Sequence, residues 1–272
     1  MKRTVDVFRA ATLAVLLGGC AGAAPESVPP EIPTVTVTET TSSITLDGKL
    51  DEAAWAATPG YALKHFDDTS GLPELEAAVV ARDPFESAEV KFLYDKNYLY
   101  VGCTLNDSDV TAYCDRDQER LFRYGDLLEV FLWPEHGTWY WELYAAPNGA
   151  RSSFFYPGGG QRGNWEFFSE KYLMKDFAVA SRIDGTRNRH NDRDRGWSTE
   201  MRIPLAELAK AGIPFAPGNA WRLMAARYNY GAEFYQLQFS SFPEMPNSNY
   251  HFRRYYAPVL FRFGEPLQKS ER

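Results

Sequence analysis

The sequence has no excess of positive charge, since its 29 lysines and arginines are outnumbered by 36 aspartates and glutamates. A protein that neutralises the phosphates of a nucleic acid needs a basic surface, so this balance argues against nucleic acid as a partner. The chain is not poor in apolar residues, because 44% of its 272 residues are hydrophobic and 15% are aromatic. A core of useful size can form, which excludes intrinsic disorder for most of the chain.

Common catalytic motifs are also missing. The sequence contains no Gly-x-Ser-x-Gly, His-Glu-x-x-His or phosphate-binding-loop pattern. The four histidines, at positions 65, 136, 190 and 251, lack metal-ligand spacing. Pairs of carboxylates could act as acid and base, but among 36 acidic residues some pair always exists, and sequence does not set their separation. We therefore expect a protein that is not an enzyme.

The pattern of the N-terminus indicates a targeting signal. Basic residues precede an apolar run over residues 10–17, which is shorter than the roughly 20 residues needed to span a bilayer but suits a signal-peptide core. Residues 17–20, Leu-Gly-Gly-Cys, resemble the lipobox of bacterial lipoproteins. The resemblance implies cleavage before Cys20 and acylation of Cys20, and two or three acyl chains give stable membrane attachment. Ala21 follows in place of Asp, which by resemblance to sorting rules in such bacteria indicates the outer membrane.

The domain organisation follows from this signal. We expect a signal peptide over residues 1–19, then the acylated Cys20 and a tether over 20–40, in which 21–33 are rich in Ala, Pro and Ser. A single domain over 41–266 follows, and we expect a monomer. Two cysteines remain, Cys103 and Cys114, and two readings stay open: one disulfide in an oxidising periplasm, or two buried thiols.

The rest of the chain predicts an all-β fold. Short stretches of alternating apolar and polar residues, rich in Val, Tyr, Phe and Trp, are separated by Gly, Pro, Asn and Asp. Residues 89–94 and 98–105 flank Asp-Lys-Asn and predict a hairpin. Helical periodicity is confined to 52–57, 116–122 and 204–209. About ten or eleven strands predict an antiparallel β-sandwich with jelly-roll-like connectivity, because short strands bury their apolar faces most simply against a second sheet.

Five blocks, in order, resemble the family 9 carbohydrate-binding module. They are ITLDGKLDEAAW (44–55), AEVKFLYD (88–95) with LYVG (99–102), GDLLEVFL (125–132), RIDGT (182–186) with DRDRGWSTEMRIP (192–204), and RYNY (227–230) with NYHF (249–252). The resemblance implies a β-sandwich whose Trp55 anchors the core, and a function in carbohydrate binding without turnover. The alternatives are a glycan-cleaving or glycan-modifying enzyme, and a structural envelope lipoprotein whose sugar site has eroded.

The same resemblance implies a set of site residues. A sugar presents an apolar face and a rim of hydroxyls, so its site needs flat aromatic rings and groups that accept or donate hydrogen bonds. Glu129 stands where the family has its sugar-binding acid, Arg151 follows one hairpin later, and Asn229 resembles the family's amide ligand. Tyr230 lies in the region of one stacking aromatic. Tyr124 lies near the position of the other, where the family has Trp.

Further aromatic residues are divided between site and core. Trp139, Trp141 and Trp165 are near Gly-rich loops and are alternative stacking platforms, although packing is the simpler interpretation for each. Three other tryptophans lie in strand or capping patterns and are expected in the core: Trp55, Trp197 and Trp221.

Two cofactor hypotheses remain. Asp192 and Asp194 lie in a loop of alternating charge and offer oxygen ligands for a structural calcium ion such as family relatives carry, although the spacing is not that of an EF-hand and a solvated loop is the simpler alternative. Asp107 and Asp109 form a weaker candidate. Met224 with His251 is the pair we would nominate for a b-type haem, as in a related sandwich superfamily.

Overall fold

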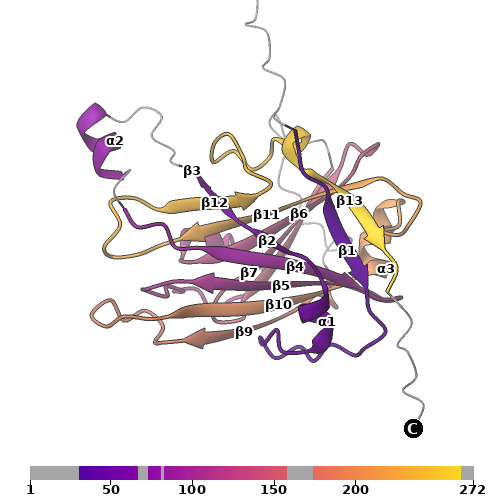
Figure 1. Cartoon of the computed structure of the whole chain (residues 1–272), viewed down its shortest axis with the longest axis horizontal. Helices are drawn as coiled ribbons and strands as arrows, with labels where there is room; N and C mark the ends of the chain where they lie inside the picture. Colours follow the sequence, from indigo (N-terminus) through magenta and orange to yellow (C-terminus); the bar gives the residue numbers. More distant parts are fainter. Residues whose placement is uncertain (1–30, 67–72, 81–82, 158–173, 265–272) are drawn as a thin grey trace, which may run out of the picture. The chain divides into compact units, whose positions relative to one another are not determined.

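The computed structural model describes residues 31–66, 73–80, 83–157 and 174–264, which form thirteen strands and three short α-helices (Figure 1). The expected all-β class is confirmed. The helices are α1 (Ala53–Ala57), α2 (Glu74–Val80) and α3 (Leu205–Leu208). The strands are β1 (Val35–Glu39), β2 (Gly60–Ala62), β3 (Lys64–Phe66), β4 (Ala88–Tyr94), β5 (Tyr98–Asn106), β6 (Leu127–Pro134), β7 (Tyr140–Ala145), β8 (Arg151–Tyr156), β9 (Ala178–Asp184), β10 (Gly196–Pro204), β11 (Trp221–Asn229), β12 (Gln238–Phe242) and β13 (Ala257–Arg262).

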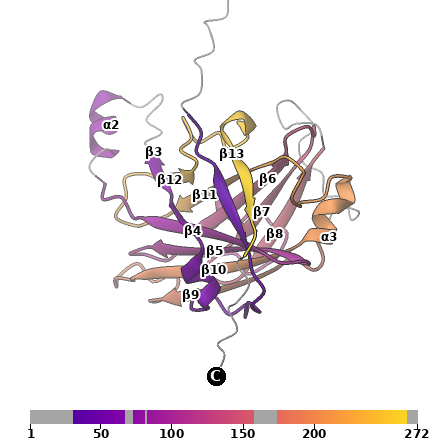
Figure 2. The ribbon, with the colours of Figure 1, turned by 45° about the vertical axis from the view of Figure 1, so that its right-hand side comes forward.

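The strands follow one another in the order β8-β7-β6-β11-β13-β1-β4-β5-β10-β9, with β12 beside β11 and β3, and β2 beside β4. Two layers result: β4, β5, β9 and β10 form the first, and β6, β7, β8 and β11 form the second (Figure 2). The main hydrophobic core joins them, because it contains side chains of both, such as Val90 and Val101 from the first layer and Val130 and Leu143 from the second. This is the sandwich arrangement that the sequence predicts.

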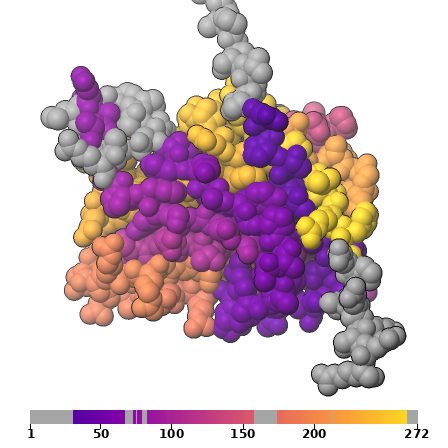
Figure 3. Space-filling model, viewed as in Figure 1, coloured from indigo at the N-terminus to yellow at the C-terminus, as the bar shows by residue number. Residues whose placement is uncertain are grey.

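Strand β1 departs from the prediction in two ways. It begins at Val35, inside the segment 20–40 predicted as a tether, so the sandwich starts earlier than residue 41. Its residues Val35 and Val37 are buried in the main core. It also pairs in parallel with both β13 and β4, which corrects the purely antiparallel expectation. Long stretches of chain separate β1 from these partners, as parallel pairing requires. The space-filling view shows β1 and β13 side by side on the surface (Figure 3).

The predicted hairpin and core tryptophans are confirmed. β4 and β5 pair in antiparallel register, and the Asp95 carboxylate closes the turn by accepting the N–H groups of Asn97 and Tyr98, both at 2.7 Å. The three tryptophans expected in the core are almost fully buried: Trp55, Trp197 and Trp221. The Trp55 indole N–H donates to Glu200 of β10 at 3.0 Å.

In the described part of the chain, no helix is long and apolar enough to cross a membrane.

Alternation along the strands of the second layer creates a second apolar face. On β6, Leu128, Val130 and Leu132 point into the main core, while Leu127 and Phe131 belong to a separate hydrophobic cluster. Successive side chains of a strand lie on opposite faces, so Glu129 shares its face with this second cluster. The cluster is rich in tyrosine and is joined by residues of the segment 245–256.

Candidate functional site

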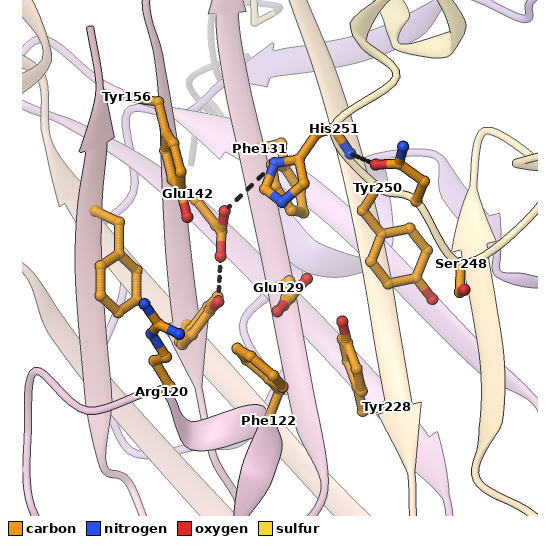
Figure 4. A pocket seen from close by; sticks show the side chains of 13 residues that line it. Arg120, Phe122, Glu129, Phe131, Glu142, Tyr156, Tyr228, Ser248, Tyr250 and His251 are labelled. Atoms are coloured by element: carbon orange, nitrogen blue, oxygen red, sulfur yellow. Dashed lines mark hydrogen bonds and ion pairs between the residues drawn. The ribbon is translucent and has the colours of Figure 1, made fainter. Parts of the chain in front are cut away.

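A cavity of about 150 Å³ lies on this second face (Figure 4). Its walls come from β6, β7, β8 and β11, from the residues around the 3₁₀ turn Leu121–Arg123, and from the loop that precedes β13. The lining residues are Arg120, Phe122, Glu129, Phe131, Glu142, Tyr144, Phe154, Tyr156, Tyr228, Ser248, Asn249, Tyr250 and His251.

Two buried carboxyl groups define the polar part of the cavity. In the β6–β7 pairing Glu129 lies opposite Tyr144, and Phe131 lies opposite Glu142, so the two glutamates are diagonal neighbours on one face. Glu129 is 2% exposed and Glu142 is 3% exposed. The Tyr144 hydroxyl donates to Oε1 of Glu142. The other oxygen, Oε2, has no hydrogen-bond partner among the described residues, and Nδ1 of His251 is 3.9 Å away from it.

Burial and proximity raise the pKa values of both carboxyl groups. Burial raises the pKa of Glu142 to about 7, although the Tyr144 and Tyr156 hydroxyls and the charge of Arg120 oppose the shift. Burial also raises the pKa of Glu129 well above its ordinary value, and the neighbouring charge of Glu142 raises it further. These shifts favour the protonated form of both carboxyl groups, and a protonated carboxyl group can donate as well as accept a hydrogen bond.

His251 is a neutral member of the site. Burial lowers its pKa to about 4, and its Nδ1 lies 2.7 Å from the Tyr140 hydroxyl. The ring also packs against Tyr156, with centroids 5.4 Å apart. Met224, its nominated partner for a haem, is fully buried in the second cluster and does not line the cavity, so the structure does not support that pairing.

Aromatic rings form the apolar wall. The ring centroids of Phe122 and Tyr228 are 5.5 Å apart, and those of Tyr228 and Tyr250 are 5.7 Å apart. Tyr250 is held in place because its hydroxyl donates to the Arg227 carbonyl at 3.3 Å. Figure 4 shows Tyr228 with its hydroxyl directed toward Glu129. Flat rings beside hydrogen-bonding groups are the combination that a sugar requires.

The structure brings only Glu129, among the three predicted polar ligands, to the cavity. Arg151 does not line it and pairs with Asp117 at 3.4 Å. Asn229 accepts a hydrogen bond from the Arg227 guanidinium at 2.7 Å and donates to Glu86 at 2.9 Å. Strand alternation explains why Arg151 lies outside the cavity. Successive side chains of β8 lie on opposite faces, so Tyr156 faces the cavity and Arg151 lies on the other face.

The predicted aromatic residues are also distributed differently. Tyr230 does not line the cavity, but its hydroxyl donates to the Phe122 carbonyl at 2.6 Å and so supports the wall. Tyr124 is 39% exposed outside the cavity. Trp141 is buried in the main core, and Trp139 packs against Trp221. Trp165 lies outside the described residues.

Two possibilities were left open for Cys103 and Cys114, and the structure shows both thiols free and buried. Cys103 belongs to the main core and Cys114 to the second cluster, so the two thiols point into different apolar regions. The reading as two buried thiols is the correct one. Burial raises the pKa of Cys103 above its ordinary range, as expected for an unreactive thiol.

The two aspartates predicted as calcium ligands accept hydrogen bonds from other residues of the chain. Asp194 accepts the N–H groups of Val110 and Thr186 at 2.8 and 2.7 Å, and Asp192 accepts the Thr186 hydroxyl at 2.7 Å. Within the ranges that the structure covers, no group of three or more His, Cys, Asp or Glu residues could hold a metal ion. The calcium hypothesis gains no support from these residues.

Most lining residues of the cavity were not predicted from the sequence, among them Arg120, Glu142, Tyr228 and Asn249. The sequence contains a signal for one of these residues, Glu142. Residues 140–145 alternate as a strand, and correct register against Glu129 places Glu142 on the same face. Arg120 supplies the guanidinium expected of Arg151, and Asn249 supplies the amide expected of Asn229. The expected chemistry is therefore present, but most of it comes from other residues.

The sequence matches no protein-family model and no curated protein. Among solved structures, a protein from Bacteroides uniformis ATCC 8492 described as a candidate carbohydrate-binding protein matches with a TM-score of 0.60 and 13% identity, over 85% of this chain and 99% of its own.

A family 9 carbohydrate-binding module from Caldicellulosiruptor kristjanssonii is also similar. Its complex with cellotriose matches with a TM-score of 0.52 and 12% identity, over 85% of this chain and 95% of that chain. Its complex with glucose matches with a TM-score of 0.53 and 11% identity, over 85% and 97%. The chain therefore has a fold like that of the family 9 carbohydrate-binding modules, as the five sequence blocks predicted.

Proposed function

We propose that the protein binds a carbohydrate in the cavity around Glu129 and does not transform it. The observation that carries this proposal is the meeting of two carboxyl groups, the Arg120 guanidinium and the Asn249 amide beside the rings of Phe122 and Tyr228. These groups accept from and donate to sugar hydroxyls, while the rings offer flat apolar surfaces. The fold of sugar-binding modules supports the same conclusion.

The size of the cavity limits the ligand. At about 150 Å³ it is smaller than the roughly 300–1,000 Å³ of pockets for drug-sized molecules. We infer that one sugar unit enters the cavity and that any further units of an oligosaccharide lie outside it.

Replacing Tyr228 with alanine is expected to weaken sugar binding by about 1–3 kcal/mol, because the ring and its hydroxyl both face the cavity. Isothermal titration of the full chain, with a glycan panel that includes glucose and cellotriose, measures this loss. Tyr235→Ala is the matched control, since Tyr235 is an exposed tyrosine that does not line the cavity. Equal affinity of the Tyr228→Ala variant and the wild type would place the ligand elsewhere.

The enzyme alternative is tested separately by product analysis on polysaccharide mixtures. The paired carboxyl groups are the candidates for acid and base in such an activity. We expect no cleavage or modification. Turnover that Glu129→Gln abolishes would show that the protein is an enzyme and overturn the proposal.

We also propose that the protein is a monomer anchored by lipid on Cys20, at the outer membrane of the cell envelope. Cys20 lies outside the described residues, and the lipobox resemblance is the support. Cys20→Ser is expected to move most of the protein from the membrane fraction to the soluble fraction, and mass spectrometry of the mature N-terminus should lose the acyl mass. Cys114→Ser should leave fractionation unchanged. A wild-type protein without acyl mass would contradict the anchor.

A further inference from the structure

The cavity holds more acidic groups than cations. Glu129 and Glu142 line it with Arg120, and His251 is neutral because burial lowers its pKa to about 4. Both carboxyl groups are more than nine-tenths buried. Glu142 lines the cavity, and its Oε2 atom has no hydrogen-bond partner in the described part of the chain. A buried carboxylate oxygen without a donor is costly unless a ligand supplies one.

The surroundings of the two glutamates differ. The Tyr144 and Tyr156 hydroxyls and the charge of Arg120 favour the ionised form of Glu142. For Glu129, only the Tyr144 hydroxyl opposes the effects of burial and of Glu142, and no described cation contributes. Tyr228 and Tyr250 also border this part of the cavity, and their hydroxyls are un-ionised because burial and Glu129 raise their pKa values. A positive charge is therefore the complement that Glu129 lacks.

The wall of the cavity is suited to the same kind of group. The rings of Phe122, Tyr228 and Tyr250 border it, and the face of an aromatic ring attracts an ammonium ion. A neutral sugar hydroxyl donates one hydrogen bond, whereas an ammonium group donates three and also balances charge. Aromatic rings combined with carboxyl groups thus favour an organic amine over a neutral polyol.

We propose that the sugar recognised in this cavity is an amino sugar, whose protonated amine is bound by Glu129 and Glu142. The inference rests on the proposed function and specifies its ligand class. It has a second consequence, since a bound cation favours the ionised form of the glutamate pair. Because burial favours the protonated form of both groups in the free protein, binding of the amine is expected to release protons to solvent.

The test is isothermal titration of the full-length wild type with four probes near pH 6: glucosamine, glucose, N-acetylglucosamine and cyclohexylamine. We expect glucosamine to bind at least about tenfold more tightly than each of the others, which corresponds to about 1.4 kcal/mol. Repeating the glucosamine titration in two buffers with different heats of ionisation should reveal proton release. These measurements need no variant, so they are informative even where a substitution prevents folding.

A variant then assigns the preference to the glutamate pair. In Glu129→Gln, the ratio of glucosamine to glucose affinity should fall to near one, while Glu244→Gln, which replaces an exposed carboxyl group outside the cavity, should retain the wild-type ratio. Glucose binding as tightly as glucosamine would overturn the amino-sugar inference and leave carbohydrate binding in place. Cyclohexylamine matching glucosamine would show an amine site without sugar recognition, and this outcome would overturn the proposed function as well. Binding of no sugar at all would do the same.

Discussion

Replacing Arg227 with methionine is expected to lower the free energy of unfolding by about 3–5 kcal/mol, because one partner of a buried ion pair is removed. Arg227 lies on β11 and is 0% exposed, and its Nη2 atom is 3.1 Å from Oδ2 of Asp107. The same guanidinium donates to Asn229 and to the Glu86 carbonyl. Asp126, a second buried acid, has a pKa raised by burial and by Asp107 and lowered by Arg227. Without the guanidinium, the Asp107 and Asp126 carboxyl groups lose the buried positive charge beside them and keep hydrogen bonds from N–H groups.

Urea unfolding followed by tryptophan fluorescence measures this loss. Arg195→Ala is the matched control, because Arg195 pairs with Asp184 on the surface, where both side chains are mostly exposed. Such pairs contribute about 0–1 kcal/mol. The double variant Arg227→Met with Asp107→Asn should recover part of the stability, since it also removes the unpaired charge. A loss below about 1 kcal/mol in Arg227→Met would mean that the buried pair contributes little.

Replacing Glu142 with glutamine is expected to change how stability depends on pH. Burial raises the pKa of Glu142 from 4.5 to about 7 in the folded protein. The folded state therefore binds this proton more tightly than the unfolded state does. The resulting stability is present below about pH 4.5 and is lost as the pH rises through about 7, by about 3 kcal/mol in total. Glutamine does not titrate, so the variant should lack this loss.

The quantity to measure is the difference in the free energy of unfolding between Glu142→Gln and the wild type. His251 acts in the opposite direction in the wild type, because its pKa is lowered to about 4 and its contribution is lost on acidification. Subtracting the unfolding free energy of the wild type from that of Glu142→Gln, at pH values from about 4.5 to 8, removes the contributions common to both. The free energy of unfolding of Glu142→Gln should rise relative to that of the wild type as the pH rises. Glu244→Gln should show no such gain, and a flat difference for Glu142→Gln would contradict the assigned pKa.

The local parts of the fold were predictable from sequence. Alternating apolar residues predicted the β4–β5 hairpin, and the turn formed because the Asp95 carboxylate accepts two adjacent backbone N–H groups. Trp55 and Trp221 were correctly expected in the core. The start of the sandwich was less predictable, since residues 35–39 are a short strand that follows a Pro-rich segment. What stabilises this strand is its pairing with β13 and β4, which are distant in sequence.

The site was predictable in its chemistry but not in its residues. Glu129, which the resemblance predicts as a sugar ligand, lines a cavity with aromatic walls, whereas Arg151 and Asn229 were expected beside it and lie elsewhere. Asn229 and Tyr228 are adjacent in sequence, yet only Tyr228 reaches the cavity. A shift of one position along a strand moves a side chain to the opposite face, so resemblance between sequence blocks does not settle which neighbour faces the cavity.

The β class, the aromatic core and the likeness to the fold of sugar-binding modules follow from composition, alternation and short local patterns. The shared cavity of Glu129, Glu142 and Arg120, and the separation of the two cysteines, follow only from the folded chain. Those outcomes depend on strand register and on contacts between distant segments. Such contacts form only when the two layers pack together, and they leave little trace in any single stretch of sequence.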